Sequence, residues 1–119
     1  MIKSESYSID TSDPGFIHVR HVQKWDNGGD LSGEIWFERA SLDWVVDTMR
    51  ACATSHGFAE ATAQKGQDHL QVYESGPEQE PFVNLYNQRP SGAPHAGDYT
   101  RKFSQPVALR LVDELAGLR

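Results

Sequence analysis

Turn sequences separate the alternating segments of this chain, and their shortness constrains its fold more than any other feature. The strongest is Asp26-Asn27-Gly28-Gly29-Asp30, which lies between the β-rich segments 16–25 and 32–38. Asparagine and glycine tolerate the positive φ angles of hairpin turns, so this sequence predicts a β-hairpin. Strands joined by so few residues run antiparallel.

Two further turn signals divide the middle of the chain in the same way. They lie at 65–68 and 76–81, and they bound three expected strands at 58–64, 69–75 and 82–87. Segment 58–64 is rich in alanine and also fits a helix, but the turn that follows it favours a strand. These strands are also expected to pair antiparallel, because the connections are short.

Two segments have the apolar spacing of amphipathic helices. The first follows Ser41, a favoured N-cap residue, and Gly57 provides its C-terminal stop. The second begins near Ser104, with Pro106 in its first turn, where proline's missing N–H does no harm. The apolar stripes are Leu42, Val45, Val46, Met49, Cys52 and Ala53 in the first helix, and Val107, Leu111, Val112 and Leu115 in the second.

The element order β-β-α-β-β-β-α predicts an α+β fold. We expect a twisted antiparallel sheet of about five strands with both helices packed on one face. A chain of 119 residues has the length of one domain, so residues 1–119 are expected to form a single α+β domain. Residues 1–15 read as a polar leader that ends at the turn Asp13-Pro14-Gly15.

Composition argues against several classes of protein. The net charge of −6 is spread along the chain without a basic block, so nucleic-acid binding is not expected, because phosphate contacts need concentrated positive charge. A single cysteine, Cys52, forms no intramolecular disulfide and no multi-cysteine zinc site. The longest apolar runs are too short to cross a membrane. We expect no membrane association and a cytoplasmic location.

No metal-binding or cofactor-binding motif is recognisable. The five histidines are His18, His21, His56, His69 and His95, and none has a ligand spacing with a carboxylate partner. We therefore predict no metal and no cofactor. Nucleophile and phosphate-binding signatures are lacking too, so the sequence leaves open whether the protein is an enzyme.

Residues 87–103 read as a long irregular loop. Loops longer than about 12 to 15 residues are uncommon in compact domains and are usually functional or disordered. The candidate ligand-binding or partner-binding residues are Arg89, His95, Asp98, Tyr99 and Arg101. The two arginines suit a carboxylate or phosphate, and His95 with Asp98 suits an acid–base pair. Packing or simple mobility of the segment is the alternative.

Three aromatic residues are candidates for an interface. Trp36 has the opposite parity to Ile35 and Phe37, Tyr73 alternates outward along its strand, and Trp44 lies off the apolar stripe of its helix. Large aromatic side chains with a polar atom are enriched at interfaces. The alternative is that one or two of them complete the core.

Two functions from different classes follow. The first is a small non-enzymatic binding module that self-associates as a homo-oligomer through the outer sheet face, with a protein as a further partner. The second is a small-molecule binder or enzyme with a pocket between the sheet and the 87–102 loop. The first is favoured because no catalytic motif accompanies the loop residues.

Overall fold

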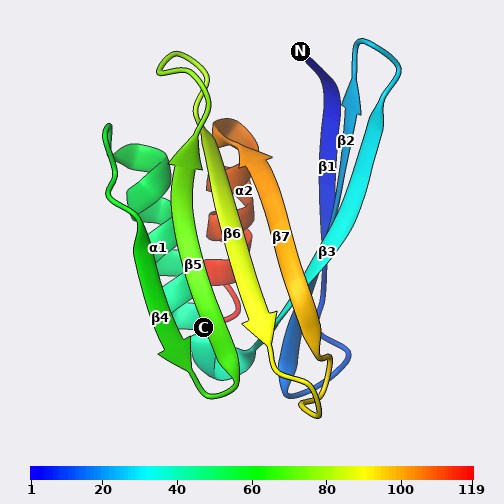
Figure 1. Ribbon diagram of the computed structural model, residues 1–119, viewed down its shortest axis with the longest axis vertical. Helices are drawn as coiled ribbons and strands as arrows, with labels where there is room; N and C mark the ends of the chain where they lie inside the picture. The colour runs from blue at the N-terminus through cyan, green and yellow to red at the C-terminus, as the bar shows by residue number, and fades with distance from the viewer.

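The structure is a computed structural model that describes residues 1–119, and it contains seven strands and two α-helices (Figure 1). The elements are β1 (Ile2–Asp10), β2 (Phe16–Trp25), β3 (Asp30–Glu38), a 3₁₀ turn (Arg39–Ser41), α1 (Leu42–Thr54), β4 (Ala61–Lys65), β5 (Asp68–Ser75), β6 (Phe82–Arg89), β7 (Gly97–Ser104) and α2 (Gln105–Ala116). This is an α+β fold, as the sequence predicts. No helix is long and apolar enough to cross a membrane.

The strands form two antiparallel sheets, not one sheet of about five strands. β1, β2 and β3 make a three-stranded sheet, and β4 to β7 make a four-stranded sheet in sequence order. Both helices lie on one face of the four-stranded sheet (Figure 1). The predicted order lacks β1 and β7, because both strands fall in segments that read as irregular.

The first correction concerns residues 1–15, whose greater part is strand β1 and not a polar leader. β1 pairs with β2 so that Tyr7 faces His21 and Ile9 faces Val19. Serine alternates with Glu5, Tyr7 and Ile9, so one face of β1 is polar and the other packs inward. Serine and glutamate have weak strand propensity, so long-range pairing with β2 decides the outcome here.

The second correction concerns residues 87–103, which are mostly strand. β6 extends to Arg89 and β7 begins at Gly97, so only 90–96 form the connection. The two strands pair continuously from Phe82 opposite Ser104 to Arg89 opposite Gly97. Asp98 and Lys102 on the solvent-open face of β7, and Arg101 on its inward face, hide the apolar alternation of a strand.

The apolar core lies between the inner faces of the sheets and the two helices. Twenty buried residues form one cluster, and both predicted helical stripes belong to it. The three-stranded sheet contributes Ile17, Val19, Ile35 and Phe37, which are each at most 2 % exposed. The core therefore continues from one sheet to the other without a boundary.

The two sheets are close at one end of the molecule and apart at the other. β3 crosses beside the lower end of β7, whereas the β2–β3 hairpin and the 76–81 connection diverge at the upper end (Figure 1). We call these the closed end and the open end. This divergence determines where a ligand can enter.

Candidate functional site

The closed end is held by a buried ion pair between Asp68 and Arg89. The Arg89 guanidinium lies 2.5 Å from Asp68 Oδ1, and both side chains are at most 1 % exposed. Asp68 also accepts hydrogen bonds from Asn87 Nδ2, the Ser41 hydroxyl and the Glu38 backbone N–H. The predicted site residue Arg89 is thus occupied by the protein's own carboxylate. It is not free to bind a ligand anion.

A stack of three rings stands beside this ion pair. Trp36 lies between His18 and His95, with ring centroids 3.8 and 3.7 Å apart and nearly parallel planes. His18 Nε2 lies 2.8 Å from Glu34, and His95 Nε2 lies 2.8 Å from Asp13. His95 pairs with Asp13 and not with Asp98. The interface candidate Trp36 has both faces covered by imidazoles of its own chain.

A second polar network joins the sheets in the interior, between the two ends. Glu5 Oε2 accepts hydrogen bonds from His21 Nε2, Gln23 Nε2 and the Ser104 backbone N–H, so β1, β2 and β7 meet at one oxygen. Arg101 Nε donates to His21 Nδ1 at 3.0 Å. Because Nδ1 accepts, the proton of the imidazole resides on Nε2, where it points at the carboxylate.

Burial and hydrogen bonding act in opposite directions on Glu5. Burial raises its pKa, but the donors His21, Ser104 and Gln23 outweigh that effect and lower the pKa to about 2. Partial burial also lowers the pKa of the Arg101 guanidinium, and the charge of Glu5 opposes that shift. Glu5 is therefore an ionised interior carboxylate at neutral pH.

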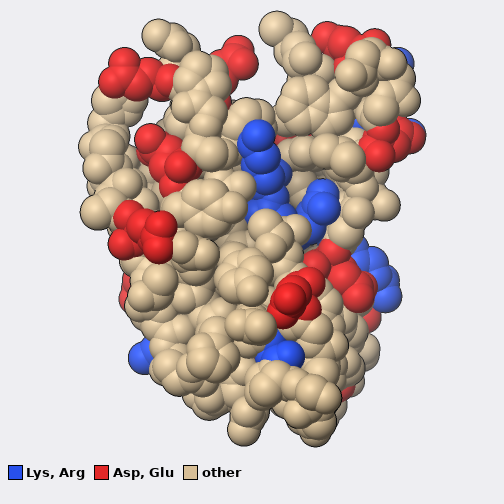
Figure 2. Space-filling model, viewed as in Figure 1, with Lys and Arg blue, Asp and Glu red and all other residues tan.

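The open end contains the hollow that most resembles a ligand site. It has a volume of about 450 Å³ and lies between the sheets, where β1 and β2 approach the 79–82 segment and the start of α2. We call it the inter-sheet cleft. Figure 2 shows it as the notch between two lobes at the upper end. Its main lining residues are Ile2, Trp25, Gln79, Pro81, Phe82 and Pro106.

Trp25 gives the inter-sheet cleft a polar group without a partner. Its indole Nε1–H is shielded from solvent and makes no hydrogen bond within the protein. Buried donors are nearly always satisfied, so an unpartnered N–H on a residue that lines a hollow makes that hollow a candidate place for an external acceptor. The other unpartnered buried atoms, His18 Nδ1 and Asn87 Oδ1, belong to the closed end and line none of the hollows described here.

Two other hollows are less suited to a ligand. One of about 530 Å³ lies along β4 and β5 beside Tyr86, but it is shallow and most of its lining residues are polar or small. Another of about 280 Å³ lies beside Gly33 and is bounded by Arg20 and Glu34. Small-molecule sites are typically enclosed, largely apolar and about 300–1,000 Å³ in volume, which favours the inter-sheet cleft.

The residues predicted as a site do not converge in one hollow. The Tyr99 hydroxyl donates to the His95 carbonyl, Arg101 is bonded to His21, and Asp98 is exposed on the open face of the four-stranded sheet. Tyr73 lies on that same face. Trp44 is partly buried and packs against the core, which is the alternative to an interface role given above for the three aromatic residues.

Sequence reasoning did not find the inter-sheet cleft as a site. A signal existed: Trp25 has the same parity as Ile17, Val19 and His21, so it belongs to the inner face of β2. A tryptophan that points inward at the end of a strand, beyond the last inward aliphatic residue, indicates an apolar position that the core does not cover. Apart from Met1 and Ile2, its partners in the cleft come from residues 79–106, which no local pattern connects to β2.

Neither a metal cluster nor an activated nucleophile accompanies this site. No three His, Cys, Asp or Glu side chains lie close enough together to hold a metal ion. Burial raises the pKa of the Cys52 thiol to about 11, which leaves it protonated and unreactive. No protein-family model matches the sequence, and no curated protein shows significant similarity to it.

Proposed function

We propose that the protein is a binding protein for a small aromatic molecule, with the inter-sheet cleft as its site. The observation that carries this proposal is the unpartnered indole N–H of Trp25, a residue that lines a mainly apolar hollow of about 450 Å³. Apolar walls with a few placed polar groups are the usual composition of a small-molecule site.

The lining defines the chemistry of the ligand. Trp25 and Phe82 offer aromatic surfaces, Pro81 and Pro106 add rigid apolar contacts, and Trp25 Nε1 is a donor without a partner in the protein. A flat apolar ligand that carries a hydrogen-bond acceptor satisfies all three features. The acidic side chain of Glu80 at the cleft and the net charge of −6 favour a neutral ligand over an anionic one.

The cleft is preformed by the fold. Glu5 ties β1 to the backbone N–H of Ser104, and Gln23 Nε2 donates to the Lys102 carbonyl at 2.6 Å, directly below the cleft. These contacts fix the distance between its walls. Preorganisation of this kind lowers the ordering cost of binding.

The test uses the neutral naphthyl ketone prodan, whose emission moves to shorter wavelength in apolar surroundings. We expect saturable binding to the native protein, weakened about 3- to 10-fold by Trp25→Phe, which keeps the aromatic wall but removes the N–H. Gln79→Trp fills the mouth of the cleft and is expected to abolish binding. Gln67→Trp, an exposed glutamine in the β4–β5 turn, is the matched control.

Two outcomes would overturn the proposal. One is the lack of saturable prodan binding by the folded native protein. The other is equal binding by Gln79→Trp and Gln67→Trp, because the probe would then occupy another surface. Circular dichroism of each variant establishes that it is folded.

A further inference from the structure

The outer face of the four-stranded sheet is covered by nothing in this chain. The helices pack on the opposite face, and the three-stranded sheet contacts the molecule along β7 (Figure 1). Strand alternation places Gln71, Tyr73, Tyr86, Asp98, Thr100 and Lys102 among the residues of this outer face. Figure 2 views this face, and its centre is largely uncharged. We call it the open sheet face.

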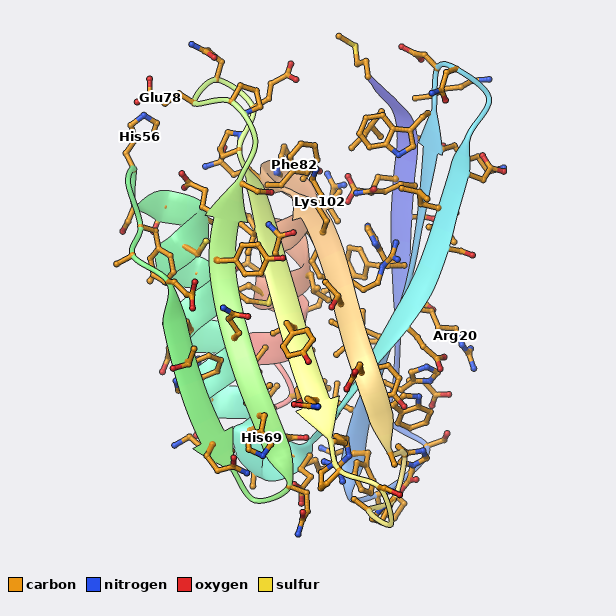
Figure 3. All side chains as sticks on the ribbon, viewed as in Figure 1. Arg20, His56, His69, Glu78, Phe82 and Lys102 are labelled. Atoms are coloured by element: carbon orange, nitrogen blue, oxygen red, sulfur yellow. The ribbon has the colours of Figure 1, made fainter.

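The charges on the open sheet face are few and ordered. Within strands β4 to β7, alternation leaves Asp98 as the only carboxylate and Lys102 as the only ammonium group on it. Both lie on β7, one on each side of Thr100, about 13 Å apart along the strand. Lys102 Nζ lies over the Phe82 ring, 4.3 Å from its centroid, and Figure 3 shows the two side chains together near the upper end of the sheet.

A straight row of paired residues crosses the middle of this face. Thr62 is opposite Gln71, Gln71 is opposite Tyr86, and Tyr86 is opposite Thr100. A two-fold axis along this row, between two facing sheets, would place each β7 over its copy in the reverse direction. Asp98 of one copy would then face Lys102 of the other, twice per dimer.

We infer that the open sheet face is a self-complementary interface, and that its occupant is a second copy of this chain. Isologous two-fold contacts require a surface whose charges are matched by its own rotated image, and Asp98 and Lys102 meet that requirement. Tyr86 next to the axis supplies the amphipathic aromatic surface that interfaces favour. Two sheets packed face to face about 10 Å apart leave room for these side chains.

The size of the face limits the area that the contact can bury. Four strands of up to eight residues cover about 19 Å by 26 Å, which is about 1,000 Å² over both copies. Interfaces of that size are at the lower limit for specific association. We therefore expect a reversible dimer that forms as the protein concentration rises, independently of any ligand in the inter-sheet cleft.

The experiment is a charge swap followed by sedimentation velocity over a range of protein concentrations. The native protein is expected to shift from monomer to dimer. Asp98→Lys and Lys102→Asp each place like charges together, and each should weaken dimerisation at least 10-fold. The double variant Asp98→Lys/Lys102→Asp restores opposite charges and should recover most of the dimer.

Matched controls carry the same charge changes elsewhere. Asp26→Lys lies at the tip of the β2–β3 hairpin, and Lys24→Asp lies on the outer face of the three-stranded sheet. Both should dimerise like the native protein. A native protein that is monomeric at every concentration, or a double variant no better than the single ones, would overturn the inference. Prodan binding reports on the cleft separately, so failure of one proposal is distinguishable from failure of the other.

Discussion

At the scale of single residues, buried polar groups connect parts of the chain that are distant in sequence. Asp68 in β5 bonds with Arg89 in β6, Ser41 before α1 and the backbone of Glu38 at the end of β3. Asp68 thereby joins four segments of the chain at the closed end, namely β5, β6, the end of β3 and the turn before α1. Buried charges of this kind are costly to expose or to leave unpaired.

The asymmetry of this network gives a stability prediction. Asp68→Ala removes the shared acceptor of four donors, of which only those of Asn87 and Arg89 keep another acceptor, whereas Arg89→Met leaves the carboxylate with three of its donors. We expect Asp68→Ala to cost about 5 kcal/mol of unfolding free energy and Arg89→Met about 3 kcal/mol, measured by urea denaturation. The exposed pair Arg50–Asp113 is the control, and Arg50→Met should cost less than about 1 kcal/mol. Equal losses for Asp68→Ala and Arg89→Met would contradict this account.

Glu5 makes stability depend on pH in a definite direction. Its pKa is lowered from 4.5 to about 2 in the folded protein, so the folded state binds this proton less readily than the unfolded state. The stabilisation is complete above about pH 4.5 and is lost as the pH falls towards 2. We expect on the order of 2 to 3 kcal/mol to disappear over that interval.

Comparison with Glu5→Gln isolates this effect from the other carboxylates. The variant is expected to be less stable at pH 7, and its unfolding free energy should fall less steeply between pH 4.5 and 2.5. Chemical denaturation at fixed ionic strength measures both curves. Parallel curves for the two proteins would show that Glu5 is not the group responsible.

Position 33 requires glycine because another side chain approaches its backbone closely, and not because of its φ angle. A Cβ atom there would lie 2.5 Å from a guanidinium nitrogen of Arg101. The bare backbone of β3 thus lets Arg101 of β7 reach His21. Sequence inspection shows a glycine within a strand but gives no indication of the side chain that occupies the space beside it.

At the scale of elements, the β6–β7 connection is attached to the three-stranded sheet by His95. This residue has a positive φ of 55°, stacks on Trp36 and bonds with Asp13, and its carbonyl accepts from Tyr99. Histidine and asparagine adopt this backbone region more readily than most residues do. The ring stack therefore holds a short hairpin connection against another sheet.

Removal of the imidazole should loosen this attachment without changing the backbone. His95→Asn keeps a residue that tolerates positive φ and is expected to lower the unfolding free energy by about 1 kcal/mol. Tryptophan fluorescence should become more accessible to acrylamide, because one face of Trp36 is uncovered. His56→Asn changes an exposed imidazole and should alter neither measurement. Unchanged quenching in His95→Asn would contradict the role given to the stack.

The elements differ in how well the sequence predicts them. Both helices and strands β2, β3, β5 and β6 follow from apolar periodicity and turn chemistry, since those signals are local. β1 and β7 were not predicted because their inward faces contain glutamate, tyrosine and arginine and few aliphatic residues. Glu5 and Arg101 form hydrogen bonds with partners across the two sheets. Local sequence patterns do not indicate such contacts.

At the scale of the whole molecule, two sheets meet at one end and diverge at the other. The closed end is fixed by Asp68 with Arg89 and by the Trp36 stack, and the middle by Glu5. The open end has no such network, and the inter-sheet cleft lies there. The division into two sheets could not be predicted from the sequence, because no local signal shows which neighbouring strands fail to pair.

The candidate site was predictable only in part for the same reason. Trp25 is recognisable as an inward residue of β2, whereas Phe82 of β6 and Pro106 of α2 become its neighbours only through tertiary packing. The 87–103 residues are chiefly structural, apart from Asp98 and Lys102 on the open sheet face. Proximity in sequence suggests His95 with Asp98 as a catalytic pair, but His95 bonds with Asp13 and Asp98 lies on the open sheet face.

The most direct test of the binding function is an NMR titration of the ¹⁵N-labelled protein with prodan. The three tryptophans give three indole N–H signals, and of the three residues only Trp25 lines the inter-sheet cleft. We predict a saturable shift of the Trp25 indole signal, together with the backbone signals of Phe82 and Gln105, while the signals of Trp36 and Trp44 stay in place. A titration in which the Trp25 signal does not move, or in which Trp36 moves instead, would contradict the account.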